Sequence, residues 1–331
     1  MQGFEENEIS KNAFGGTELS KRAIAERIPE ELANKFQVIA SRARELNEEK
    51  IRIYWHHDLP EDPEVKDLID SSNRDKYHKF VFVSNWQLNE FHNKLGFPLD
   101  GKSIVIENPI VPIELTAPKP TNRINLIYFS TPHRGLELLV PVFEELSKKY
   151  DNIHLDVFSS FEIYGWKKTD TIFESIFQKI KDHPNMTYHG FKTNDVVREY
   201  LKNAHILAYP NVWKETSCRV LIESMSAGLM CVHPNYGALP ETGAGLTSMY
   251  QFDQNPHQHM KKFYDYLEHA INVVETDAAQ NYLKFVKTYA DIRFNLDKIS
   301  GQWYTVMEDL DAQYKDKDLS IPKDVFVYNT N

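Results

Sequence analysis

The chain has 331 residues, of which 41% are hydrophobic and 26% charged, with a formal net charge of −10. That length suits about two domains of ~100–200 residues, and the composition is typical of globular proteins with buried cores. Because neither half is basic, an extended nucleic-acid surface or a surface for anionic membranes is not expected. Only Cys218 and Cys231 are cysteines, and we find no signal-peptide pattern and no apolar run near ~18 residues. These features predict a cytoplasmic protein without a disulfide framework or a transmembrane segment.

Residues 1–12 are polar, and no strand is expected before the first glycine motif, Gly15-Gly16. Two glycines let a backbone approach a ligand closely. Thr17 is suited to cap a helix that runs toward Arg27. A glycine pair before a helix start can bind a phosphate, although it more commonly marks a turn.

The next feature is a pair of histidines followed by an aspartate, His56-His57-Asp58, at the end of an expected strand. Histidine and carboxylate side chains are metal ligands. Neighbouring residues of a strand point to opposite faces, however, so a shared metal ion is disfavoured. The strands expected in this half cover residues 36–40, 51–55, 80–84 and 104–107, with a helix over 86–95.

A proline-rich connector is expected near the first third of the chain. Its prolines are Pro109, Pro112, Pro118 and Pro120. Such spacing predicts a stiff, extended segment. We therefore expect an N-terminal domain over residues 1–115, a second domain over 116–300, and a C-terminal helix and tail over 301–331 that returns to the first domain.

The second half begins with a strand over 125–129, a polar loop and an amphipathic helix that ends near Leu146. Arg134 lies in that loop, where an arginine can bind two phosphate oxygens at a helix start. The further strands are expected over 153–158 and 186–191, and the further helices over 171–182, 195–201, 260–274, 278–290 and 299–310.

Residues 206–241 form the most informative stretch. A short apolar strand ends at Pro210, a polar loop follows, and Thr216 or Ser217 is suited to cap the next helix. Gly228 ends that helix, and a second buried strand over 229–232 follows. Strand, helix and strand in this order predict a parallel sheet, whose ligands bind beyond the carboxyl ends of its strands.

Glu215 and Glu223 are separated by about two helical turns within this stretch. A carboxylate only accepts hydrogen bonds, so the pair suits sugar and ribose hydroxyls. In a chain with 48 acidic residues, such a pair also arises on a solvated helix face.

The surrounding pattern resembles the donor half of family-4 retaining glycosyltransferases. It consists of Tyr209-Pro210, Glu215, Glu223, Ser224 to Gly228, Cys231-Val232, Gly237 and Glu241. The loop from Ser130 to Leu136 resembles the family's phosphate-binding loop, with Arg134 matching the second of two basic groups and none matching the first. The resemblance implies the GT-B fold, an α/β architecture with two Rossmann-like doubly wound domains that face each other across a cleft.

The resemblance also implies the site residues. The donor site would comprise Gly15, Gly16, Ser130, Arg134, Gly190, Phe191, Glu215, Thr216, Ser217, Cys218 and Glu223. Catalytic roles fall to Glu215, His57 and Arg134, and the acceptor side to His57 and Asp58.

The implied activity is the transfer of a hexose, with retention, from a UDP- or GDP-linked sugar to a sugar, glycan or other hydroxyl acceptor. No metal and no cofactor beyond the co-substrate is expected. The alternatives are a nucleotide-sugar epimerase or a phosphorylase of the same fold, and a degenerate donor-binding subunit without activity.

Overall fold

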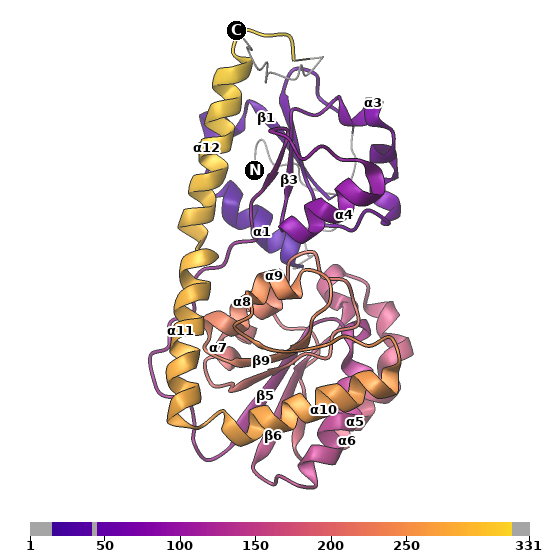
Figure 1. Ribbon diagram of the computed structural model, residues 1–331, viewed down its shortest axis with the longest axis vertical. Helices are drawn as coiled ribbons and strands as arrows, with labels where there is room; N and C mark the ends of the chain where they lie inside the picture. Colours follow the sequence, from indigo (N-terminus) through magenta and orange to yellow (C-terminus); the bar gives the residue numbers. More distant parts are fainter. Residues whose placement is uncertain (1–14, 42–44, 320–331) are drawn as a thin grey trace. The chain divides into compact units, whose positions relative to one another are not determined.

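The computed structural model describes residues 15–41 and 45–319, which divide into two compact units (Figure 1). Unit 1 comprises residues 16–109 and 296–319 within the described ranges, and unit 2 comprises residue 15 and residues 110–295. The expected lack of a strand in residues 1–12 and the last part of the expected tail lie outside the described residues.

Unit 1 contains a parallel sheet of four strands in the order β1-β2-β3-β4. The strands are β1 (Phe36–Ala40), β2 (Ile51–Trp55), β3 (Lys79–Phe82) and β4 (Ser103–Val105). Their side chains alternate between two separate cores, because successive residues of a strand point to opposite faces. Ile53 and Trp55 lie in one core and Tyr54 in the other.

Five α-helices and one 3-10 segment accompany this sheet among the described residues. They are α1 (Gly16–Ala25), α2 (Glu30–Ala33), η1 (Pro63–Ile69), α3 (Ser71–Arg74), α4 (Asn85–Leu95) and, from the far end of the sequence, α12 (Leu296–Tyr314). Helix α12 buries Ile299, Trp303 and Met307, which recur every four residues and form one apolar face. Trp303 meets Trp55 edge to face with ring centroids 4.7 Å apart, so α12 completes the core of unit 1.

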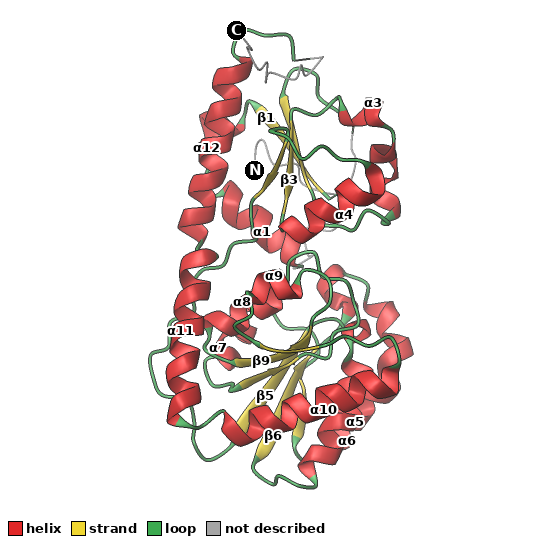
Figure 2. Cartoon of the chain, viewed as in Figure 1, coloured by secondary structure: helices red, strands yellow, loops and turns green. Residues whose placement is uncertain are grey.

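Unit 2 contains a six-stranded parallel sheet in the order β10-β9-β8-β5-β6-β7. The strands are β5 (Ile124–Phe129), β6 (Ile153–Phe158), β7 (Met186–Tyr188), β8 (Ile206–Ala208), β9 (Met230–Pro234) and β10 (Ser248–Tyr250). The central strand β5 is buried over its first five residues, because helices cover both faces of the sheet (Figure 2).

The helices of unit 2 connect successive strands, except for α10 and α11, which follow the last strand β10. They are η2 (Pro132–Arg134), α5 (Leu136–Ser147), η3 (Phe161–Tyr164), η4 (Lys167–Phe173), α6 (Glu174–Asp182), α7 (Asn194–Leu201), α8 (Arg219–Ser226), α9 (Leu239–Gly243), α10 (Pro256–Val273) and α11 (Asp277–Arg293). Helix α5 packs against α6 and α10, whereas α8 packs against α9 and α11. No helix among residues 15–41 and 45–319 is long and apolar enough to cross a membrane.

The chain passes between the units at 109/110 and 295/296, and not at the expected boundaries of 115/116 and 300/301. The reason is local pairing within unit 2. The amide of Ile110 donates to the carbonyl of Phe294 at 2.8 Å, and the amide of Ile113 donates to Ser226 Oγ at 2.9 Å. Residues 110–113 are therefore part of unit 2, although they fall within the proline-rich stretch expected to be a stiff, extended connector.

Several expected element bounds differ from the structure. Strand β9 covers Met230–Pro234, whereas a strand over 229–232 was expected. Helix α1 begins at Gly16, so Thr17 lies inside its first turn and is not its cap. The helix expected over 171–182 is α-helical only from Glu174, since η4 precedes it.

Candidate functional site

The loops after β5 and β8 meet at one edge of the sheet of unit 2. These two strands are parallel neighbours, with Leu126 paired to Ile206. Residues 130–135 follow β5, and residues 209–218 follow β8. Because both strands end at the same edge, their loops share the place where open α/β sheets bind ligands.

Glu215 is the centre of a buried polar cluster at this edge. Its Oε1 atom accepts a hydrogen bond from Arg134 Nη1 at 2.8 Å and another from Tyr209 Oη at 2.6 Å. Glu215 is only 6% exposed. Its Oε2 atom accepts no hydrogen bond from any residue of the described chain, so this oxygen can accept one from a ligand hydroxyl.

Burial and the neighbouring charges set the protonation states of the side chains in this cluster. Burial disfavours the charge of Arg134, but the negative charge of Glu215 outweighs it, and the pKa of Arg134 is raised well above its usual value. Burial and the charge of Glu215 also raise the pKa of Tyr209 and of Cys218. Arg134 therefore stays charged, while the phenol and the thiol stay protonated.

Two glycines allow the backbone to come close to this cluster. Gly135 has a φ of +109°, and a Cβ atom there would lie 2.1 Å from the carbonyl oxygen of Pro210. Gly237 has a φ of +62°, and a Cβ atom there would lie 2.7 Å from the backbone nitrogen and oxygen of Glu215. The amide of Ala238 donates to the Glu215 carbonyl at 2.8 Å, so this backbone is fixed on both sides.

Helix α8 begins later than expected. Its first residue is Arg219 and its N-cap is Cys218, whose side chain makes no capping hydrogen bond. Thr216 and Ser217 therefore lie in the loop, and the prediction that one of them caps the helix is wrong. The difference arises because Glu215 is held in the buried cluster, which fixes the loop independently of capping preference.

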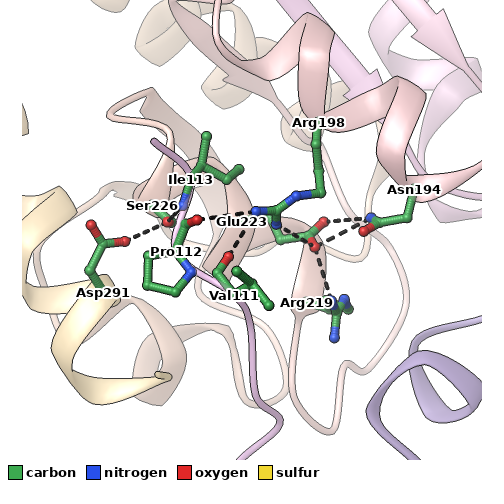
Figure 3. Close-up of polar contacts among 9 residues, drawn as sticks. All are labelled: Val111, Pro112, Ile113, Asn194, Arg198, Arg219, Glu223, Ser226 and Asp291. Carbon is green, nitrogen blue, oxygen red and sulfur yellow. Dashed lines mark hydrogen bonds and ion pairs between the residues drawn. The ribbon is translucent and has the colours of Figure 1, made fainter. Parts of the chain in front are cut away.

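Glu223 lies on α8 and is 1% exposed (Figure 3). Asn194 Nδ2 donates to both of its oxygens, at 3.3 and 3.1 Å. Arg198 Nη1 and Arg219 Nη2 reach its Oε1 atom at 3.4 and 3.1 Å. Two cations and an amide thus hold one carboxylate, so Glu223 does not belong to a solvated helix face.

The other predicted donor residues of unit 2 lie along the same edge of the sheet. Ser130 follows β5 directly. Gly190, with a φ of +64°, and Phe191 follow the edge strand β7. Strands β5 and β6 separate β7 from β8, so Gly190 and Phe191 lie apart from the Glu215 cluster in the order of the strands.

The predicted residues of the first half of the chain lie at two turns, and all of them except Gly15 belong to unit 1. Gly15 precedes α1, and Gly16 is its first residue. His57 follows β2 with its ring 4.6 Å from that of Trp55, and burial lowers its pKa to about 3. The carbonyl of Asp58 accepts a hydrogen bond from Gln87 Nε2 at 2.8 Å. His56 lies in the second core of unit 1, stacked on Phe82.

Several polar residues of the two clusters were not singled out from the sequence as site residues. Tyr209 was used only as part of a strand and turn pattern. Asn194 and Arg198 are four apart on α7, although the expected helix began only at residue 195, and Arg219 and Glu223 are four apart on α8, so this spacing places each pair on one helix face. This four-residue spacing is the sequence feature from which these residues could have been identified as partners of Glu223.

Residues 124–269 match the family model described as glycosyl transferases group 1. The chain carries a glycosyltransferase domain. The matched residues include all the side chains described above around Glu215 and Glu223. The expectation of a glycosyltransferase is confirmed at this level. Comparison with curated protein sequences finds no significant match.

Solved structures extend the similarity beyond the glycosyltransferase domain. A glycosyltransferase from Rickettsia africae superposes with a TM-score of 0.68 at 15% identity, covering 95% of this chain and 85% of that one. The sucrose-phosphate synthase of Thermosynechococcus elongatus gives 0.65 at 14% identity, covering 80% and 69%. The Anabaena protein HepE in complex with UDP-glucose gives 0.62 at 15% identity, covering 78% and 72%. These likenesses confirm the expected GT-B fold with its two Rossmann-like parallel sheets.

Proposed function

We propose that this glycosyltransferase moves a hexose from a UDP-linked sugar to an acceptor hydroxyl of a sugar or glycan, with retention and without a metal ion. The observation that carries the proposal is the buried Glu215 carboxylate, whose Oε1 atom binds Arg134 and Tyr209 while Oε2 binds no residue that the structure describes. The uridine nucleotide is proposed because HepE was solved with UDP-glucose and the pneumococcal transferase GtfA with UDP and GlcNAc.

In this proposal, Glu215 Oε2 accepts a hydrogen bond from a hydroxyl of the donor sugar. Arg134 lies beside it with a permanent charge, which suits the leaving diphosphate. The acceptor oxygen forms its bond to the anomeric carbon on the face from which the diphosphate oxygen departs. The acceptor proton passes to a phosphate oxygen of that leaving group, so no protein base is needed.

Glu223 is proposed to bind the ribose hydroxyls of the nucleotide. Its Oε1 atom already accepts hydrogen bonds from three side chains, whereas Oε2 accepts, among residues 15–41 and 45–319, only the one from Asn194 at 3.1 Å. A carboxylate oxygen has room for about two hydrogen bonds, so Oε2 can accept one more.

A donor screen tests the proposal. The melting temperature would be measured with UDP-, GDP-, ADP- and dTDP-sugars for the unaltered chain and for Glu215→Gln, Glu223→Ala and Arg134→Ala. A ligand that binds only the folded state raises the melting temperature by mass action. We expect a rise with UDP-sugars that is lost in Glu223→Ala and Arg134→Ala. Arg123→Ala is the matched control, because Arg123 bonds Asn125 at the amino end of β5.

Product analysis completes the test. With donor and acceptor sugars present, we expect a product whose anomeric configuration equals that of the donor, formed at the same rate in excess EDTA. An inverted product, or activity that EDTA removes and Mn²⁺ restores, would contradict the proposed mechanism. Donor binding without any release of the sugar would instead favour the non-catalytic subunit.

A further inference from the structure

The segment that enters unit 2, residues 110–113, is held at residues 111–113 by side chains of helices distant in the sequence. Arg198 Nη2 donates to the carbonyl oxygens of Val111 and Pro112, at 2.8 and 3.2 Å. The amide of Ile113 donates to Ser226 Oγ at 2.9 Å, and Ser226 Oγ donates to Asp291 at 2.5 Å (Figure 3). The backbone of residues 111–113 is therefore fixed by α7, α8 and α11.

The same arginine also reaches the Glu223 carboxylate. Arg198 Nη1 lies 3.4 Å from Glu223 Oε1, so its two terminal nitrogens serve two different elements. Figure 3 shows the guanidinium of Arg198 between Glu223 and the carbonyls of Val111 and Pro112. A guanidinium is planar and its donors keep a fixed geometry, so the position of one partner constrains the other.

We propose that Arg198 is a positioning residue for the donor ribose, which fixes the Glu223 carboxylate to the segment that enters unit 2. This inference rests on the proposed contact between Glu223 and the ribose hydroxyls. Arg198, with Arg219, engages Oε1 and leaves Oε2 as the oxygen that receives the ribose. Arg198 itself does not touch the nucleotide.

The proposal differs from a general stabilising role in one measurable way. If Arg198 acts through Glu223, its loss weakens a ligand that has ribose hydroxyls and leaves one that lacks them nearly unaffected. A merely structural role would weaken both ligands equally. UDP and 2′,3′-dideoxy-UDP form such a pair, because they differ only in the two hydroxyls.

The experiment is titration calorimetry of the full chain with UDP and with 2′,3′-dideoxy-UDP. The variants are Arg198→Gln, Arg198→Lys, Glu223→Gln and the double variant Arg198→Gln/Glu223→Gln, with Arg123→Gln as control. We expect Arg198→Gln to weaken UDP binding about tenfold, the effect of losing one hydrogen bond to a charged group. The same variant should weaken binding of 2′,3′-dideoxy-UDP by less than about twofold. Arg198→Lys retains a charge but cannot bond both elements, so its loss should be intermediate.

The double variant tests whether the two residues act together. In the Glu223→Gln background, Arg198→Gln should add no further loss of UDP affinity. The double variant removes the charges of Arg198 and Glu223 together, while Arg219 loses its Glu223 partner in both the single and the double Glu223 variant, so that loss cancels in the comparison. The melting temperature of each unliganded variant would be recorded beside its affinity.

The failures of the two proposals can be told apart. If Glu223→Gln weakens UDP and the dideoxy analogue equally, the proposed ribose contact itself is wrong. If Glu223→Gln discriminates between them and Arg198→Gln does not, the ribose contact stands and the role of Arg198 is overturned. Additive losses in the double variant would likewise overturn it.

Discussion

Glu215 shows at the scale of single residues how the fold prepares a carboxylate for a ligand. Removal of a carboxylate from water is costly unless hydrogen bonds compensate it. Here Arg134 and Tyr209 compensate one oxygen and leave the other unengaged among the described residues. A ligand hydroxyl that donates to Oε2 would therefore give the second carboxylate oxygen a hydrogen bond as well.

We expect Tyr209→Phe to lower the free energy of unfolding by about 1.5–3 kcal/mol, the range for a hydrogen bond to a charged group. The ring of Tyr209 is fully buried, so phenylalanine keeps its packing and loses only the 2.6 Å bond to Glu215. Urea unfolding would measure the loss. Tyr128→Phe is the matched control, because the buried Tyr128 hydroxyl donates at 2.8 Å to the neutral carbonyl of Thr131. Equal losses in the two variants would contradict the charged character of the Glu215 bond.

At the scale of elements, the site depends on loops that approach each other more closely than side chains allow. The loops after β5 and after β8 come together at Gly135 and Pro210. Gly135 also takes a left-handed conformation, which a residue with a Cβ atom adopts only with strain.

We expect Gly135→Ala to lower the free energy of unfolding by more than about 2 kcal/mol, because its methyl group would lie 2.1 Å from the Pro210 carbonyl oxygen. Gly245→Ala is the control, since Gly245 has a φ of +71° but nothing within 4 Å of an added Cβ. That variant should lose only about 1 kcal/mol, the cost of the backbone conformation. The same urea-unfolding experiment compares the two variants. An equal loss of the free energy of unfolding at both positions would contradict the expected clash between the added methyl group and the Pro210 carbonyl oxygen.

At the scale of the whole molecule, buried neutral histidines make stability depend on pH. Burial lowers the pKa of His57 and His78 to about 3, and the pKa of His205 and His233 to about 4. In the unfolded chain these rings take up protons near pH 6.5. Below that pH the unfolded chain binds more protons than the folded one, so the free energy of unfolding falls as the pH falls toward about 4.

We expect the urea midpoint to decrease steadily between pH 6.5 and pH 5, a range above the usual titration of carboxylates. Each fully buried histidine contributes at most about 1.4 kcal/mol per unit of pH. The His233→Asn variant lacks one such ring, so its urea midpoint should decrease less between pH 6.5 and pH 5 than that of the unaltered chain. His233 bonds Thr247 Oγ1 at 2.8 Å, so asparagine is chosen to retain a polar partner. A midpoint that stays constant from pH 7 to pH 5 would contradict the expectation.

Much of the secondary structure could be predicted from local pattern alone. The strands expected over residues 36–40, 51–55 and 153–158 have the bounds of β1, β2 and β6. Apolar residues dominate these runs and polar turns flank them, and burial on a parallel sheet favours that pattern regardless of the partner strands. Helix starts were less predictable, because the buried bonds of Glu215 decide where α8 begins.

The sequence by itself determined that Arg134 and Glu215 each follow a buried strand and that the chain resembles a glycosyltransferase. Only the tertiary structure decided that these two residues, 81 positions apart, form an ion pair, because the strand order places β5 beside β8. The tertiary structure alone also joined Arg198 to both Glu223 and the entering segment. Local patterns encode which face of an element is buried, whereas side-chain partners across elements depend on which strands and helices are neighbours in space.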